Sequence, residues 1–154
     1  MPRRALILVE GASNGPLYVQ AARQRGLHPI TLSADPAQYD YIAVEGTEAI
    51  RLDTTDLEAL ISQCSRLRQT YDIAGITSAQ EAFYATVGKL CQHFDLPGPN
   101  PSSIERCCDK FTQRQLLAEA GVPVPSYQLA ESATDVESAA AEIGLPVVIK
   151  PVVG

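Results

Sequence analysis

The stretch RALILVEGASNGP, residues 4–16, decides the fold class of this chain. Residues 4–9 form a short apolar run, the pattern of a strand that is buried on both faces. Residues 10–15 are a small-residue loop, and from Pro16 onward apolar side chains recur at three- and four-residue spacing, which predicts a helix. A buried strand, a tight turn and a helix are the opening of a doubly wound α/β domain with a parallel sheet.

The same alternation continues through about residue 95. Further strands are predicted at 29–33 (PITLS) and 72–77 (DIAGIT), and helices are predicted from Asp56 and from Phe83. Between them, residues 39–41 are expected to be a loop, with short strands at 42–44 and 49–52. Residues 1–95 are therefore expected to form one doubly wound α/β domain, whose sheet is covered on both faces.

The composition changes after Phe94. Three prolines fall within residues 96–103, so residues 96–108 are predicted to be a linker with a short helix from Ser103. Residues 109–154 are predicted to hold two helices and two strands, at 126–129 and 146–150. The first helix should turn the apolar side chains Phe111, Leu116, Leu117 and Ala120 inward. These elements are too few for an independent core, so we expect them to be the incomplete start of a second domain.

The composition also excludes several classes of function. The 154 residues carry 18 acidic and 12 basic side chains, and the net charge of −6 argues against binding to nucleic acid or to an anionic membrane. No apolar run is long enough to span a membrane, and the five apolar residues after Arg4 are too few for a secretory signal. A cytoplasmic location with reduced thiols is therefore expected. Cys107 and Cys108 suggest a redox or metal role, but two ordinary thiols on a helix are favoured.

The loop at residues 10–15 lies where doubly wound sheets bind ligands. Gly11 and Gly15 would let a ligand approach the backbone, and Asp35 follows the second strand, as the ribose-binding acid does in dinucleotide folds. The spacing is not G-x-G-x-x-G, however, and a tight strand-to-helix turn explains the glycines equally well.

A second polar group follows the strand at 72–77. Ser78 and Glu81 would lie at the same edge of the sheet, where a carboxylate could hold an amine or hydroxyl group of a small substrate. Alternatively, Ser78 caps the next helix and Glu81 completes a capping box.

The most specific signal lies after the linker. Lys110 opens a helix, and Lys150 ends the apolar run PVVIK at 146–150. Burial of the lysine stem directs the ammonium group toward a cleft, so the two lysines could converge on the phosphates of a nucleotide. Alternatively, Asp109 simply caps a helix beside an exposed Lys110.

These motifs resemble a known family. D-K-x-x-x-R-x-x-L-x-x-x-G-V-P-x-P at residues 109–125, followed by G-L-P-V-V-I-K-P at 144–151, is similar to the ATP-grasp enzymes, in their carboxylate–amine ligase branch. The resemblance implies that residues 1–95 are the Rossmann-like pre-ATP-grasp domain of that family. It also implies that Lys110 and Lys150 bind ATP and that Ser13, Asn14, Ser78 and Glu81 are candidate contacts for small-molecule carboxylate and amine substrates.

In that family a substrate carboxylate attacks the γ-phosphate of ATP, and an amine then displaces phosphate from the acyl phosphate, with Mg²⁺ required. The sequence stops where the family's flexible phosphate loop would begin, and the family's metal ligands and late arginine are not in it. The 154 residues alone are therefore expected to be inactive. Family members are often dimers, so a homodimer is an open expectation.

Two other functions stay open at this point. The chain could be a truncated, non-catalytic α/β module that binds a small ligand or a partner. Alternatively, Gly11, Gly15 and Asp35 could belong to a dinucleotide-dependent oxidoreductase.

Overall fold

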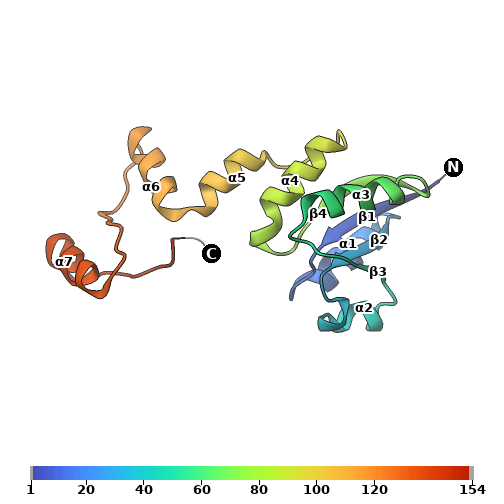
Figure 1. Cartoon of the computed structure of the whole chain (residues 1–154), viewed down its shortest axis with the longest axis horizontal. Coiled ribbons are helices and arrows are strands. Elements are labelled where there is room, and N and C mark those ends of the chain that lie inside the picture. Colours follow the sequence, from blue (N-terminus) through green and yellow to red (C-terminus); the bar gives the residue numbers. More distant parts are fainter. Residues whose placement is uncertain (1, 153–154) are drawn as a thin grey trace. The chain divides into compact units, whose positions relative to one another are not determined.

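The computed structural model describes residues 2–152 of the chain, which divides into two compact units. The first unit is Met1–Ile104 and the second is Glu105–Gly154, and the helix α5 (Pro101–Cys108) runs across the boundary (Figure 1). Each unit is described by itself below.

The first unit contains a four-stranded parallel sheet. Its strands are β1 (Arg3–Val9), β2 (His28–Ser33), β3 (Glu48–Arg51) and β4 (Tyr71–Thr77), in the order β3-β2-β1-β4. Ile7 of β1 pairs with Ile30 of β2 on one side and with Ile76 of β4 on the other. The predicted α/β class with a parallel sheet is confirmed, and the strands at 29–33, 49–52 and 72–77 lie within a residue or two of their predicted positions.

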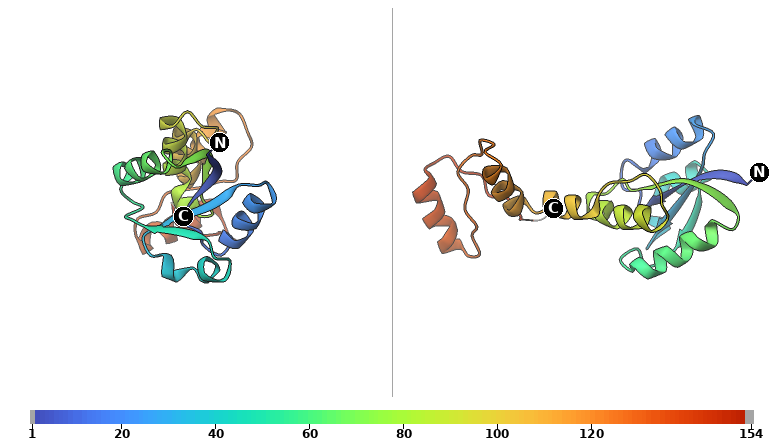
Figure 2. Two further views of the ribbon diagram at one scale, coloured as in Figure 1. Left: turned by 90° about the vertical axis from the view of Figure 1, so that its right-hand side faces the viewer. Right: turned by 90° about the horizontal axis from the view of Figure 1, so that it is seen from above.

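Helices cover both faces of this sheet, as Figure 2 shows for α1 and α3. On one face, α3 (Leu57–Leu67) and α4 (Tyr84–His93) bury Leu60, Cys64 and Leu90 against the strands. On the other face, α1 (Gly15–Gln24) buries Val19 against Leu8. The helix starts follow local chemistry: α1 has a proline in its first turn, and the Asp56 carboxylate accepts hydrogen bonds from two backbone N–H groups of α3.

Residues 36–44 differ from the prediction. They form a short 3₁₀ helix (η1, Pro36–Gln38) and one helical turn (α2, Asp40–Val44), rather than a loop and a strand at 42–44. Tyr41 is buried against Val19 and Leu8, whereas the side chain of Val44 is 82% exposed. The buried tyrosine anchors the turn, and the apolar run IAV that suggested a strand is partly on the surface.

Besides the end of α5, the second unit contains two helices, joined and followed by segments without regular secondary structure. Asp109 caps α6 (Lys110–Glu119) by accepting from the Thr112 N–H at 2.7 Å, and Ser132 caps α7 (Ala133–Ile143) by accepting from the Asp135 N–H at 3.2 Å. Gly144 ends α7 with a φ of +89°, as predicted.

The predicted packing of this unit is wrong in two respects. Neither α6 nor α7 buries a side chain, and Leu116, which we expected to face inward, is 39% exposed. The segments 126–129 and 146–150 have no regular secondary structure and are not strands. Within the described part of this unit, no neighbouring strand lies beside them to complete a hydrogen-bond ladder.

None of the helices over residues 2–152 is long and apolar enough to cross a membrane.

Candidate functional site

The carboxyl ends of the four parallel strands bring several loops to one edge of the first unit. These are the loops after β1 (residues 10–14), β2 (34–35), β3 (52–56) and β4 (78–80). In open α/β sheets this edge is where ligands bind, so it is the candidate site of the first unit.

Glu10 joins these loops. Its side chain is only 3% exposed, and its carboxylate accepts hydrogen bonds from three different segments. The four donors are Ser33 Oγ at 2.8 Å, the Ala34 N–H at 2.8 Å, Thr54 Oγ1 at 2.8 Å and Tyr39 OH at 2.6 Å. Burial by itself raises the pKa of Glu10, but the hydrogen bonds from these four donors outweigh it, so the pKa lies below its ordinary value of 4.5. Glu10 is therefore a buried carboxylate that stays ionised at neutral pH.

The loop after β4 is tied to the same network. Gln80 donates from Nε2 to the hydroxyl of Tyr39 at 2.8 Å, and the Ala79 N–H donates to the backbone oxygen of Glu10 at 3.4 Å. These two bonds place residues 78–80 beside the loop at 10–14.

The predicted capping box is wrong. Ser78 is 2% exposed, and its Oγ accepts from the Gln80 N–H at 3.0 Å, two residues along the chain. A 3₁₀ helix (η2, Glu81–Phe83) with Gln80 at its N-cap precedes α4, so Ser78 stabilises a turn before the helix. Of the predicted substrate contacts, Ser13, Asn14 and Glu81 are exposed at this edge, whereas the Ser78 side chain is turned inward.

The ring of Tyr41 lies against the glycines of the first loop. A Cβ at Gly11 would come within 2.1 Å of the Tyr41 hydroxyl oxygen, and one at Gly15 within 2.4 Å of the ring. The tyrosine hydroxyl also bonds Thr31 Oγ1 at 3.1 Å. The glycines thus make room for an aromatic ring where a dinucleotide fold holds its pyrophosphate. In addition, Asp35 pairs with Arg51, so the features that suggested a dinucleotide site have other partners.

The second unit brings the two predicted lysine segments together. The backbone N–H of Lys110, the first residue of α6, donates to the backbone oxygen of Val152 at 2.8 Å. Lys150 lies two residues earlier and is exposed. The Lys150–Val152 segment therefore passes the N-terminus of α6, where Lys110 begins the helix.

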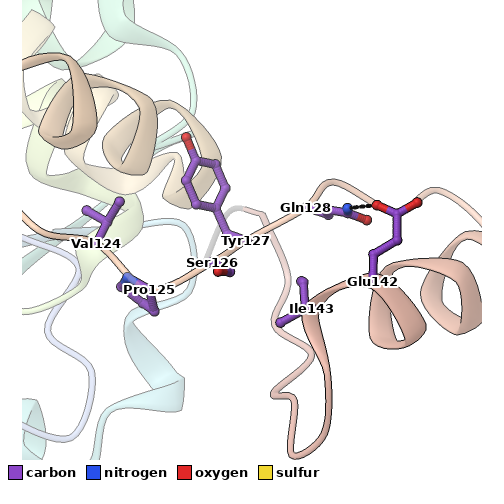
Figure 3. Close-up of a pocket in the computed structure, with 7 residues that line it drawn as sticks. All are labelled: Val124, Pro125, Ser126, Tyr127, Gln128, Glu142 and Ile143. Carbon is purple, nitrogen blue, oxygen red and sulfur yellow. Dashed lines mark hydrogen bonds between the residues drawn. The ribbon is translucent and has the colours of Figure 1, made fainter.

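A separate depression lies elsewhere in the second unit. It has a volume of about 570 Å³ and is lined by residues 124–128, Glu142 and Ile143 (Figure 3). A hydrogen bond from Gln128 Nε2 to Glu142 Oε2 (2.5 Å) crosses one end of it. Neither predicted lysine lines this depression.

Sequence reasoning missed Glu10, Tyr39 and Gln80 as members of the candidate site. A signal for Glu10 was present, because an acidic residue directly after a fully apolar strand has to be either exposed or fully hydrogen-bonded. No cluster of three metal-ligating side chains occurs among residues 2–152.

No family model matches the chain. Over 153 residues it is 61% identical to the uncharacterized protein y4rH of Sinorhizobium fredii, a match that covers 99% of this chain and 32% of that protein. Over 146 residues it is 25% identical to the N5-carboxyaminoimidazole ribonucleotide synthase of Staphylococcus aureus, covering 93% of this chain and 36% of the synthase. The chain thus spans about a third of the length of these relatives.

The solved structures agree with this relationship. The L-amino acid ligase from Bacillus licheniformis superposes with a TM-score of 0.70 at 18% identity, over 100% of this chain and 38% of the ligase. The chain has the fold of the N-terminal part of ATP-grasp ligases. The Staphylococcus aureus synthetase, solved in complex with ADP, gives a TM-score of 0.68 at 24% identity, over 97% of this chain and 39% of that protein. Weak relatives and structural neighbours of the chain are accordingly ATP-grasp carboxylate–amine ligases, the class indicated by its motifs.

Proposed function

We propose that the complete protein is an ATP-dependent ligase that joins a carboxylate to an amine through an acyl phosphate, and that this chain is its N-terminal part. The observation that carries the proposal is the extent of the fold match to the L-amino acid ligase, which covers both units. A match limited to the α/β unit would be shared with many unrelated enzymes, because that architecture supports many functions.

In this proposal the nucleotide belongs to the second unit. Lys110 and Lys150 are carried by segments that meet at the N-terminus of α6, and two ammonium groups there suit the phosphates of ATP. The Tyr41 ring fills the space above the first-loop glycines, which argues against a nucleotide at that place in the first unit and against an oxidoreductase.

The reaction proceeds by two displacements. An oxygen of the substrate carboxylate attacks the γ-phosphorus of ATP, and the bond to the bridging oxygen breaks to release ADP. The amine nitrogen then attacks the acyl carbon, phosphate leaves, and the nitrogen loses a proton. The lysines hold and neutralise phosphate oxygens. Magnesium would neutralise the transferred group in such a ligase, but residues 2–152 supply no cluster of ligands for it, so its ligands are assigned to the rest of the complete protein.

Small-molecule carboxylate and amine substrates would approach the carboxyl edge of the first unit. Ser13, Asn14 and Glu81 are exposed there and are the proposed contacts. Ser78 keeps a supporting role, because its hydroxyl is buried in the turn that shapes the loop after β4.

The test is ADP release by the protein as its own gene expresses it. An intact mass first establishes the length of that product, and pairs of amino acids and other carboxylates and amines are then screened with ATP and Mg²⁺. The change Lys150→Ala should reduce turnover at least about 100-fold, as expected for loss of a group that stabilises transferring phosphate. Lys89→Ala, at an exposed position of α4, is the matched control. Circular dichroism should show both variants folded.

Near-normal ADP release by Lys150→Ala would refute the assignment of this lysine. A native product of only 16.5 kDa that releases no ADP with any pair would refute the ligase function and favour a non-catalytic binding module.

A further inference from the structure

The hydrogen bonds around Glu10 have a fixed direction. The ionised carboxylate can only accept, and each of its oxygens already accepts two hydrogen bonds. Glu10 therefore has no capacity left to bind a substrate amine or to take a proton. Glu10 can therefore affect a substrate only through the residues that its hydrogen bonds position.

The hydrogen bond to Glu10 also fixes which hydrogen bonds Tyr39 can donate and accept. Its single hydroxyl proton has to be donated to Glu10, so the phenolic oxygen can only accept from any other neighbour. Burial, together with the hydrogen bond to Glu10 and its charge, raises the pKa of Tyr39 to about 12, which keeps this proton in place. The group next to Tyr39 must consequently be a donor.

That group is the side-chain amide of Gln80. Its Nε2 donates to the Tyr39 hydroxyl at 2.8 Å, so the amide cannot turn its oxygen toward the tyrosine without placing two acceptors together. The single hydroxyl proton of Tyr39 thus fixes the orientation of the Gln80 amide. Gln80 Oε1 then points away from Tyr39, and no described residue donates a hydrogen bond to it.

The position of this oxygen matters because Gln80 is partly exposed at the carboxyl edge. The turn around Ser78 Oγ fixes the Gln80 backbone, and the Ala79–Glu10 hydrogen bond keeps the loop beside Ser13 and Asn14. An acceptor oxygen suits an N–H donor of an ammonium group and disfavours a carboxylate, which can only accept.

We propose that Gln80 accepts a hydrogen bond from the amino group of a substrate, and that Glu10 and Tyr39 are positioning residues that hold its amide oxygen toward that group. This subsite rests on the proposed ligase function, in which an amine is one of the reactants, and it places the amine at the first unit.

The experiment is a titration of the ¹⁵N-labelled chain followed by NMR. The probe is L-alaninamide, and the matched control ligand is propionamide, which lacks only the amino group. We expect L-alaninamide at millimolar concentration to shift the backbone and side-chain resonances of Gln80, and propionamide to leave them unchanged. Tyr39→Phe keeps the ring but releases the amide, and Gln80→Met removes the acceptor. Each should weaken L-alaninamide binding by about fivefold or more.

Gln69→Met, at an exposed glutamine on the opposite edge of the sheet, should bind as the unchanged chain does. Well-dispersed spectra establish that each variant is folded. The proposal is overturned by equal shifts from both ligands, by no shift at Gln80, or by unchanged affinity in Tyr39→Phe and Gln80→Met. If the complete protein releases ADP and the titration fails, only the amine subsite is wrong. If binding is observed but no substrate pair gives ADP, the ligase function is wrong and the subsite stands as a binding site.

Discussion

Replacing Glu10 by glutamine keeps the shape of the side chain but removes its charge. Hydrogen bonds to a charged group contribute about 1.5–3 kcal/mol each and neutral ones about 0.5–1.5, so the midpoints differ by about 1.25 kcal/mol per bond and four bonds give a loss of about 5 kcal/mol before any offset. The new NH₂ group also faces the hydroxyls of Ser33 and Tyr39, which have to turn in order to accept. Removing the charge also removes the cost of burying it, which offsets part of this loss of stability. We expect the free energy of unfolding at pH 7 to fall by about 2 kcal/mol.

Urea unfolding monitored by tyrosine fluorescence suits this measurement. The chain has no tryptophan, and all of its tyrosines except Tyr127 lie in the first unit. The folded pKa of Glu10 is lowered, so its contribution is fully present above the unfolded value of about 4.5 and is lost as the pH falls through the folded pKa. The stability difference between the unchanged chain and Glu10→Gln should therefore shrink below about pH 4.5. All other carboxylates are the same in the two proteins, so their contributions to the pH dependence cancel in this difference.

Glu58→Gln, at an exposed position of α3, is the control and should change stability by less than about 0.5 kcal/mol. Two results would refute the reasoning about the buried carboxylate. One is a Glu10→Gln variant as stable as the unchanged chain at pH 7, and the other is a stability difference that stays constant from pH 7 down to acid unfolding.

Other consequences of the structure can be measured with single variants and with thiol chemistry. Gly11→Ala should destabilise the first unit by about 2 kcal/mol or more, because the new Cβ would overlap the ring of Tyr41. The control is Gly75→Ala, whose Cβ would make only an ordinary contact at 3.5 Å. In the same urea titration its free energy of unfolding should lie within about 1 kcal/mol of that of the unchanged chain. Burial raises the pKa of Cys64 to about 12 and also raises the pKa of Cys91. Both thiols should therefore react with Ellman's reagent only after unfolding. Cys107 is exposed and should react in the native protein. Rapid labelling of Cys64 without urea would contradict the packing of α3.

The sheet and its main helices could be predicted because their patterns are local. β1 is a continuous apolar run, and α3 carries a stripe that includes Leu60, Cys64 and Leu67 at helical spacing, all of them buried. These patterns need no knowledge of distant residues. The same local rules failed at 42–44, where Tyr41 rather than the following apolar residues makes the packing contact.

The second unit shows the limit of apolar patterns more clearly. The apolar residues of the PVVIK segment suggested a buried strand, yet Val148 is 80% and Ile149 72% exposed. An apolar run indicates that a segment can be buried, but a ladder also needs a neighbouring strand, which the described residues of this unit do not provide. The pattern alone could not reveal this.

The candidate site was only partly predictable. Its place at the carboxyl edge followed from the predicted alternation of parallel strands and helices, and Ser13, Asn14 and Glu81 do lie exposed there. The role of Glu10 depends on donors 23 to 44 residues away, such as Ser33 and Thr54. No local signal connects such residues, because their meeting is a product of the complete sheet.

The packing of Tyr41 on the first-loop glycines has a consequence for titration experiments. With this ring in place, the turn after β1 cannot hold a second nucleotide in competition with a site elsewhere in the protein. Under the proposed ligase function, nucleotide titrations of the complete protein should therefore show no second binding phase from this turn. A smaller side chain at position 41 would leave space beside Gly11 and Gly15. A second, weaker phase of nucleotide binding in such a variant would show that this space had become accessible.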